Sequence, residues 1–234
     1  MKVHHPMNPR SLAALSAIGA CLLCGNTQAG PRVTETADAL PTRDCELEAG
    51  TARERVSGVP ALRIHEAVFG CGVGFNTQVN VGWARATFEG ESASGYALMG
   101  KTTYVMPEAG RTGWGLAYGL AAVRNSSNSL RWQEAAVSLV ATRELAGNWL
   151  MHANLGVSHD RDAKLNTTIW SLGVESTDTL ALAADVFGDD RSRPWLSGGV
   201  GYSLGGGLSA SVRVAQQFEQ PRVRSVSVGV KLVF

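Results

Sequence analysis

The chain has 234 residues, of which 21 are lysine or arginine and 20 are aspartate or glutamate, giving a formal net charge of +1 at pH 7. A nucleic-acid-binding protein would show a basic excess or a basic stripe, so this balance argues against nucleic acid as a partner. The length suits one all-β domain. Beyond the N-terminal region, no apolar run reaches the roughly 20 residues that a membrane-spanning helix requires.

Residues 1–29 have the layout of an export signal peptide. Lys2 and Arg10 precede the apolar run SLAALSAIGACLL, and small residues at Thr27 and Ala29 offer a cleavage site. Cleavage after Ala29 would remove two of the 21 bases and no acid, so the mature chain would be slightly acidic. The alternative is a lipoprotein signal, IGAC, in which Cys21 would carry the lipid. The apolar leucines after Cys21 and the better site downstream favour ordinary cleavage.

The rest of the chain alternates between apolar and small or polar residues in segments that are separated by turn-forming stretches. Glycine, proline, asparagine, aspartate and serine dominate these stretches because they tolerate or cap turn geometry. The eleven turns are expected at 57–60, 74–78, 89–94, 106–113, 124–129, 144–148, 159–166, 175–179, 189–194, 204–207 and 219–222. They separate twelve segments of roughly the length of strands that cross a bilayer.

Twelve alternating strands predict an all-β fold, a transmembrane antiparallel up-and-down β-barrel over residues 45–234. An even strand number brings both ends to one side, as in bacterial outer-membrane barrels. A soluble lipocalin-like barrel would use about eight strands and turn its apolar face inward. Residues 30–44 show no alternation. They are expected to form an N-terminal periplasmic segment that either stays in the periplasm or enters the barrel mouth.

The last strand ends on a bare phenylalanine, in the sequence SVSVGVKLVF. Val230, Leu232 and Phe234 share one face of this strand. A terminal aromatic residue on an alternating strand resembles the assembly signal of outer-membrane barrels. We therefore expect the barrel-assembly machinery as a partner and the cell outer membrane as the location.

Aromatic residues gather toward the expected strand ends, as amphipathic side chains do at membrane interfaces. One ring is expected at the periplasmic ends, formed by Tyr104, Trp114, Trp149 and Tyr202. A second ring is expected at the outer ends, formed by Tyr96, Trp132 and Trp195. Trp83 and Trp170 lie mid-strand and fit neither ring.

Two cysteines remain after the expected cleavage, Cys45 and Cys71. Both are 13 residues from Gly58, in the first expected hairpin turn, so they lie opposite each other in the simplest register. An exported chain can keep a disulfide. We therefore predict a cross-strand disulfide near the periplasmic rim; the alternative is two free thiols.

If the apolar face meets lipid, the polar residues of the other face point into the barrel, because a charge at mid-depth in lipid costs about 2–4 kcal/mol. Two interpretations stay open: a narrow aqueous path whose charges select solutes, or a filled interior of paired charges. Small residues in the same positions, such as Gly115, Gly156 and Gly173, leave room and favour the path. The predicted pore-lining residues are Glu66, Lys101, Glu134, His152, Asn154, Asp185, Arg213 and Lys231.

The lead-in TETADALP and the ELE at the start of the first strand (34–50), followed by alternating strands and the closing VSVGVKLVF, resemble the outer-membrane transporters grouped with the MetA pathway of phenol degradation. The resemblance spans residues 34–234. It implies an outer-membrane barrel that passes small apolar or aromatic compounds, and it carries over no catalytic residue.

Enzymatic and metal chemistry find little support. GYSLG at 201–205 matches a nucleophile-elbow pattern with Ser203, but that motif opens a helix and needs a histidine later in the chain. Histidines show no metal-ligand spacing, and HDRD at 159–162 is better explained as a charged loop than as a cation site. No cofactor is expected.

The sequence thus predicts a narrow channel or transporter for small-molecule solutes, with a non-transporting structural or binding barrel as the alternative and an outer-membrane hydrolase as the third reading. Outer-membrane lipid is the expected surrounding. The basic residues of the outer loops, in DDRSRP and HDRDAKLN, are expected to hold lipopolysaccharide phosphates.

Overall fold

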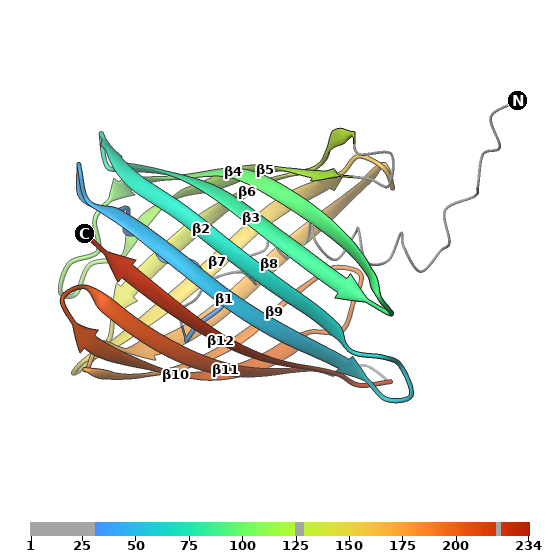
Figure 1. The fold of residues 1–234 in the computed structure, drawn as a ribbon. Helices are drawn as coiled ribbons and strands as arrows, with labels where there is room; N and C mark the ends of the chain where they lie inside the picture. The colour runs from blue at the N-terminus through green and yellow to red at the C-terminus, as the bar shows by residue number, and fades with distance from the viewer. Residues whose placement is uncertain (1–30, 125–128, 219–220) are drawn as a thin grey trace, which may run out of the picture.

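The computed structural model describes residues 31–124, 129–218 and 221–234. These residues form a closed antiparallel barrel in which each strand pairs with its sequence neighbours and β1 pairs with β12 (Figure 1). The predicted fold is confirmed. The strands are β1 (Cys45–Val56), β2 (Leu62–Gly74), β3 (Thr77–Phe88), β4 (Glu91–Val105), β5 (Gly113–Arg124), β6 (Leu130–Glu144), β7 (Trp149–Asp160), β8 (Leu165–Ser176), β9 (Leu180–Asp189), β10 (Trp195–Gly205), β11 (Leu208–Gln217) and β12 (Val223–Val233).

The two-residue period of each strand sorts apolar side chains to the outside. On β12, Val226, Val228, Val230 and Leu232 are exposed on the outer surface, while the residues between them are partly buried. The same holds around the wall, where Leu98, Leu120, Leu155 and Val212 are half exposed. A barrel with its apolar side chains outside and its polar ones inside is suited to lipid, not to water. Within the described ranges, no helix is long and apolar enough to cross a membrane.

The start of β1 and the end of β12 meet at one rim of the barrel. There the Cys45 amide donates a hydrogen bond to the Phe234 carbonyl at 2.8 Å. The disulfide between Cys45 and Cys71 lies at the same rim. This rim holds the start of β1 and the end of β12, and we assign it to the periplasm, as the even strand number leads one to expect. The signal peptide and the lipoprotein alternative at Cys21 lie outside the described residues.

The aromatic rings agree with the expectation at most positions. Tyr104, Trp114, Trp149 and Tyr202 are exposed on the outer wall near the periplasmic ends of their strands, and Trp132 and Tyr96 near the outer ends. Trp195 was expected in the outer ring, and this prediction is wrong. It shares the inward face of β10 with the buried Ser197 and pairs across the sheet with Phe187. The expectation used the position of Trp195 at the outer strand end, whereas its face follows from the parity that it shares with Ser197.

Residues 31–44 run inside the barrel, across its lumen. We call residues 31–44 the lumenal strap. Val33, Thr34 and Ala37 of the strap are buried, and the strap continues directly into β1. The sequence left two locations open for this segment, the periplasm or the barrel mouth. In the structure the segment lies inside the barrel and not only in the periplasm.

Glycines on the inward face of the wall make room for the strap. A Cβ atom at Gly72 would lie 2.1 Å from the Pro41 carbonyl oxygen, and one at Gly199 would lie 2.0 Å from that of Pro31. Such distances are far below van der Waals contact, so a larger residue would collide with the strap backbone. Part of the room that the small inward residues leave is thus filled by the strap.

Candidate functional site: the strapped lumen

Polar side chains of the wall hold the backbone of the strap. The carboxylate of Asp185 on β9 accepts hydrogen bonds from the amides of Val33 and Thr34, at 3.1 and 3.0 Å. Asp185 is 2% exposed. Buried backbone amides need partners, and a carboxylate that accepts two of them makes charge-assisted bonds. Asp185 therefore acts as the main anchor at the N-terminal end of the strap.

Three more wall residues continue this pattern toward the periplasmic rim. Their side-chain oxygens accept the amides of Ala37, Ala39 and Leu40 at 2.8, 3.0 and 3.1 Å. The acceptors come from β6, β4 and β3 and are, in that order, Thr142, Thr103 and Gln78. The strap is therefore fastened to strands on several sides of the barrel and crosses its interior.

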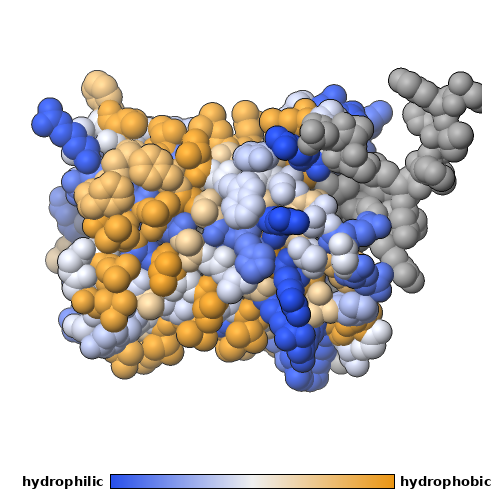
Figure 2. Space-filling model, in the orientation of Figure 1, coloured by the Kyte–Doolittle hydropathy of each residue, from blue (hydrophilic) through white to orange (hydrophobic). Residues whose placement is uncertain are grey.

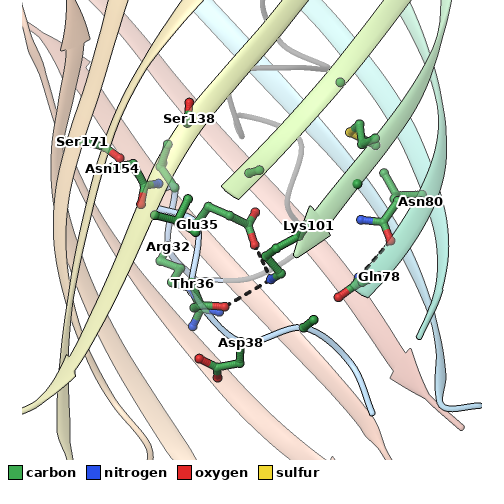
Figure 3. A pocket seen from close by; sticks show the side chains of 18 of the residues that line it. Arg32, Glu35, Thr36, Asp38, Gln78, Asn80, Lys101, Ser138, Asn154 and Ser171 are labelled. Carbon is green, nitrogen blue, oxygen red and sulfur yellow. Dashed lines mark hydrogen bonds and ion pairs between the residues drawn. The ribbon is translucent and has the colours of Figure 1, made fainter. Parts of the chain in front are cut away.

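Ion pairs fasten the side chains of the strap as well (Figure 3). Lys101 on β4 lies 2.7 Å from Glu35, Arg32 pairs with Glu175 on β8, and Arg213 on β11 donates to the Arg32 carbonyl at 2.9 Å. Burial alone would raise the pKa of Glu35, but the Lys101 ammonium holds the pKa of this carboxyl below its ordinary value. Glu35 is thus charged when the strap is docked.

His152 on β7 lies beside the strap and is completely buried. Its Nδ1 is 3.0 Å from the Thr142 hydroxyl, and its Nε2 is 3.3 Å from a Glu175 carboxylate oxygen. A hydroxyl, an imidazole and a carboxylate in this order resemble a nucleophile, base and acid. The Thr142 hydroxyl, however, already accepts the Ala37 amide and is 1% exposed. The group therefore serves as an anchor of the strap and offers no open nucleophile.

The eight predicted pore-lining residues all lie on the inward face. Asp185, Lys101, Arg213 and His152 hold or adjoin the strap, as described above. The Asn154 amide faces the backbone of Glu35 and the Ser171 hydroxyl. Lys231 bridges Glu46 and Glu48 at 2.6 and 3.0 Å. Glu66 lies with Arg213 at a small second cavity, and Glu134 is buried on β6. Their role in lining a solute path stays a prediction.

A cavity of about 830 Å³ remains between the strap and the wall. Pro41 and Met106 line it near the periplasmic rim, and Asp189 and Trp195 line it near the outer ends of their strands. Figure 3 shows polar side chains of the strap and of the wall directed into this space, among them Asp38, Ser138 and Asn80. The strap thus narrows the lumen, and a space lined from both halves of the barrel is left beside it.

An aromatic pair stands at the outer half of this cavity. Phe187 and Trp195 stack with ring centroids 6.0 Å apart and an interplanar angle of 9°. Ile169 lines the same space. The sequence interpretation missed this pair. The regular spacing of Trp195 with Ser197, Gly199 and Gly201, all on the small and polar face of one strand, was the signal that could have found it.

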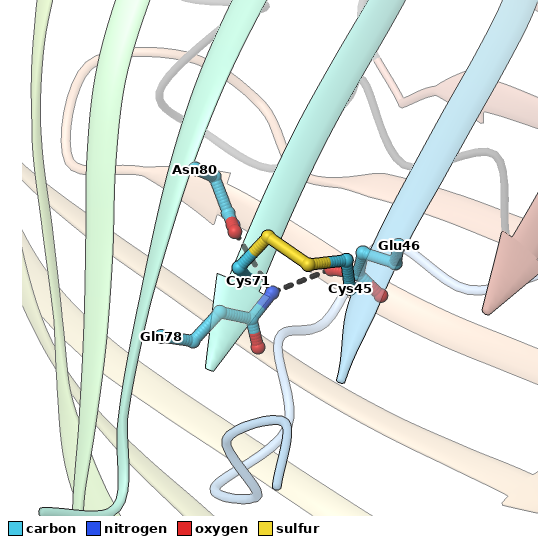
Figure 4. Close-up of a disulfide and its surroundings, with 5 residues drawn as sticks. All are labelled: Cys45, Glu46, Cys71, Gln78 and Asn80. Carbon is cyan, nitrogen blue, oxygen red and sulfur yellow. Dashed lines mark hydrogen bonds between the residues drawn. A yellow bond between two sulfur atoms is a disulfide. The ribbon is translucent and has the colours of Figure 1, made fainter. Parts of the chain in front are cut away.

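The predicted disulfide is present between Cys45 and Cys71, which are opposite each other in the β1–β2 register (Figure 4). Close to it, the Gln78 side-chain amide donates to Glu46 and to Asn80. Gln78 also accepts the Leu40 amide. The disulfide and this amide together tie the end of the strap to β1, β2 and β3.

The remaining sequence motifs do not build a second site. Ser203 lies near the end of β10, just before the turn to β11, and no helix follows it. In the part of the chain that the structure describes, no group of three or more His, Cys, Asp or Glu side chains could hold a metal ion.

Comparisons with known proteins agree with the barrel. A family model described as "Uncharacterised conserved protein UCP029691" matches residues 21–234. No curated protein matches the sequence. The COG4313 outer membrane channel from Pseudomonas putida F1 is similar in structure, with a TM-score of 0.65 and 10% identity over 85% of this chain and 98% of that one. The KdgM porin in complex with disordered oligogalacturonate gives 0.61 and 9%, over 80% and 99%.

The NanC porin is similar as well, with a TM-score of 0.56 and 8% identity over 80% of this chain and 98% of that one. At such identities the likeness concerns the fold. The fold and the apolar outer wall together place the chain in the outer membrane. The resemblance to the MetA-pathway transporters is not confirmed by these matches.

Proposed function

We propose that this chain, which belongs to the uncharacterised conserved protein family UCP029691, is a narrow outer-membrane diffusion channel for small molecules whose bore is set by the lumenal strap. The observation that carries the proposal is the cavity beside the strap, which is lined by residues near both ends of the barrel. The similar fold of known porins supports the proposal.

The size of the cavity limits the solutes. Sites for drug-sized molecules measure about 300–1,000 Å³, and the cavity of 830 Å³ lies within this range. An extended polymer would need the whole lumen and would meet the strap. We therefore propose solutes of the size of one or two sugar or aromatic rings.

The charge of the lining argues against selection for polyanions. The described cavity lining carries both signs, and acids outnumber bases. The acids are Glu35, Asp38, Glu46, Glu48 and Asp189, and the bases are Arg32, Lys101 and Lys231. An anionic oligosaccharide such as the oligogalacturonate in the KdgM complex would be disfavoured by this excess of acids over bases. Neutral or weakly charged solutes fit this lining better.

The Phe187–Trp195 pair favours solutes with an apolar or aromatic part, as the resemblance to the MetA-pathway family also implies. Aromatic rings attract each other in offset or edge-on stacks. Uptake into proteoliposomes of phenylalanine, compared with leucine, tests this. We expect faster uptake of phenylalanine and loss of the difference in Trp195→Ser; equal uptake in the native protein would contradict it.

The experiment that tests the channel itself is planar-bilayer conductance of the refolded mature chain and of a variant that lacks residues 31–40. We expect steady unitary currents in the first and larger ones in the second. A matched control replaces residues 31–40 by glycine and serine of equal length, which removes the anchors and keeps the chain length. Asp38→Lys, at a residue exposed in the lumen, is expected to shift the ion preference toward anions.

Folded barrels that stay silent in every form would contradict a channel and favour the alternative, a structural or binding barrel. Lys101→Glu and Arg213→Glu are less suited as charge probes, because both residues also hold the strap. A hydrolase is not favoured, since the Thr142 hydroxyl is buried and engaged.

A further inference from the structure

The four neighbouring strands β12, β1, β2 and β3 separate their charges by face. In the sequence TARERV of β1, the arginines Arg53 and Arg55 are exposed, and Glu54 between them points inward toward Arg213. The other acids of these strands, Glu46, Glu48 and Glu66, also lie on the inward face. The described outward face of these strands therefore carries cations and no carboxylate.

Five arginines and one histidine of this face form three cross-strand pairs near the outer ends of the strands. Arg53 is the register partner of Arg63, Arg55 of Arg224, and His65 of Arg85. All six side chains are exposed. We call them the basic wall patch. Figure 2 shows the hydrophilic area toward the outer end of this wall, with the apolar surface toward the periplasmic end.

Like charges directly opposite each other on a sheet destabilise it, and cations on a lipid-facing surface are costly. The neutral partners that the structure gives, Ser92 for Arg85 at 3.1 Å and Gln216 for Arg224 at 3.2 Å, do not offset this charge. The nearby acids of the β3–β4 hairpin tip are Glu89 and Glu91. Two arginine pairs, Arg53–Arg63 and Arg55–Arg224, beside the His65–Arg85 pair, indicate a bound anion as a counter-charge.

We infer that the basic wall patch binds the phosphate groups of the phosphorylated glycolipid of the outer leaflet. The patch faces lipid, lies in the outer half of the wall and carries a concentration of arginine. The planar guanidinium binds phosphate through two parallel hydrogen bonds. The β9–β10 wall lacks this feature at its outer end, because the register partners Val186 and Leu196 take the outward positions there. The contact is therefore one-sided.

This location differs from the sequence expectation, which placed lipopolysaccharide on the loops. In those loops Arg161 stacks on Trp132, with the guanidinium 5.2 Å from the ring centroid. Arg191 lies 3.8 Å from Asp190 and donates to the Asn166 carbonyl. These two loop arginines thus have partners within the protein, whereas the wall patch offers five arginines and one histidine to the lipid.

The test is binding of diphosphorylated lipid A to the full mature chain in detergent, measured by native mass spectrometry, beside lipid A with the same acyl chains and no phosphate. We expect the native chain to prefer the phosphorylated lipid. The triple variant Arg53→Gln, Arg55→Gln, Arg63→Gln should lose about fivefold per arginine, or on the order of 100-fold. High salt should weaken the native binding as well.

The matched control is Arg161→Gln, Arg191→Gln, Arg193→Gln, which removes the same charge from the loops at the same end. It should bind as the native chain does. Equal binding of both lipids by the native chain would overturn the inference, as would a triple wall variant that binds like the loop variant. Folding of each variant is checked by its heat-dependent gel mobility. If a variant does not fold, the comparison of the two lipids on the native chain still tests the inference.

Discussion

Substitution of Asp185 by alanine is expected to release the N-terminal half of the strap. Asp185 accepts the Val33 and Thr34 amides at 3.1 and 3.0 Å, and the Ser197 hydroxyl at 3.2 Å. Alanine would leave two buried amides without acceptors. Their desolvation cost disappears when the strap leaves the wall and meets water. The substitution therefore stabilises the undocked strap relative to the docked one.

The expected size follows from the two hydrogen bonds to the strap. A hydrogen bond to a charged group contributes about 1.5–3 kcal/mol. The lower value, for two bonds, gives about 3 kcal/mol. Since about 1.4 kcal/mol corresponds to a tenfold change in an equilibrium constant, the undocked population should rise about 100-fold.

Thiol labelling measures this population. Thr34 is fully buried, and its hydroxyl has no hydrogen-bond partner among the described residues, so Thr34→Cys should disturb the strap little. Cys45 and Cys71 are joined in the disulfide, and Cys21 and Cys24 belong to the expected signal peptide. The introduced thiol is then the single reactive one, and its rate of reaction with a maleimide reports how often the strap leaves the wall.

The control is Asp189→Ala on the same strand, whose carboxylate accepts the Arg191 and Ser192 amides of the β9–β10 turn instead of the strap. It should leave the labelling rate at the level of the Thr34→Cys chain. If Asp185→Ala labels no faster than Asp189→Ala, then the strap is not held by Asp185, and the account of its docking is refuted.

Three further predictions concern the strap and the disulfide at its C-terminal end. Gly199→Val should force the strap away from β10 and raise the single-channel conductance. Acidification should also raise the conductance, because the Lys101 ammonium lowers the pKa of Glu35 in the docked strap. The Glu35–Lys101 pair stabilises docking fully above the ordinary pKa of 4.5. This stabilisation is lost as the pH falls through the lower pKa of Glu35 in the docked strap. Loss of the disulfide in Cys45→Ser, Cys71→Ser, which spans 26 residues, should lower the free energy of unfolding in urea by about 3 kcal/mol.

Each of these predictions has its own control. Gly198→Val places its side chain on the lipid face, where an added Cβ atom would lie 3.9 Å from its nearest neighbour. This substitution should leave the conductance unchanged. Glu35→Gln should remove its part of the response to acid, and an unaltered acid response would count against this ion pair. Reduction of the native disulfide should reproduce the unfolding curve of the double serine variant; coincidence of both curves with that of the oxidised chain would contradict a stabilising role.

The alternation of the strands determined the barrel, the strand number and the face of each polar residue. These properties are local, because the side of a residue follows from its position parity once the strand is located. The same reasoning placed Cys45 opposite Cys71, since a short hairpin defines its own register. The expectation for Trp195 failed because it used closeness to the strand end and not the parity that Trp195 shares with Ser197.

Only the tertiary structure decided what fills the barrel. Residues 31–44 have no periodicity, and their position depends on Asp185, Thr142, Thr103 and Gln78, which come from four different strands. These side chains meet the strap only after the barrel has closed. The basic wall patch likewise needs the register of four strands, which brings Arg53, Arg63 and their neighbours side by side. Contacts between distant segments carry no local pattern, so the sequence alone predicted a lumen but not the strap that narrows it.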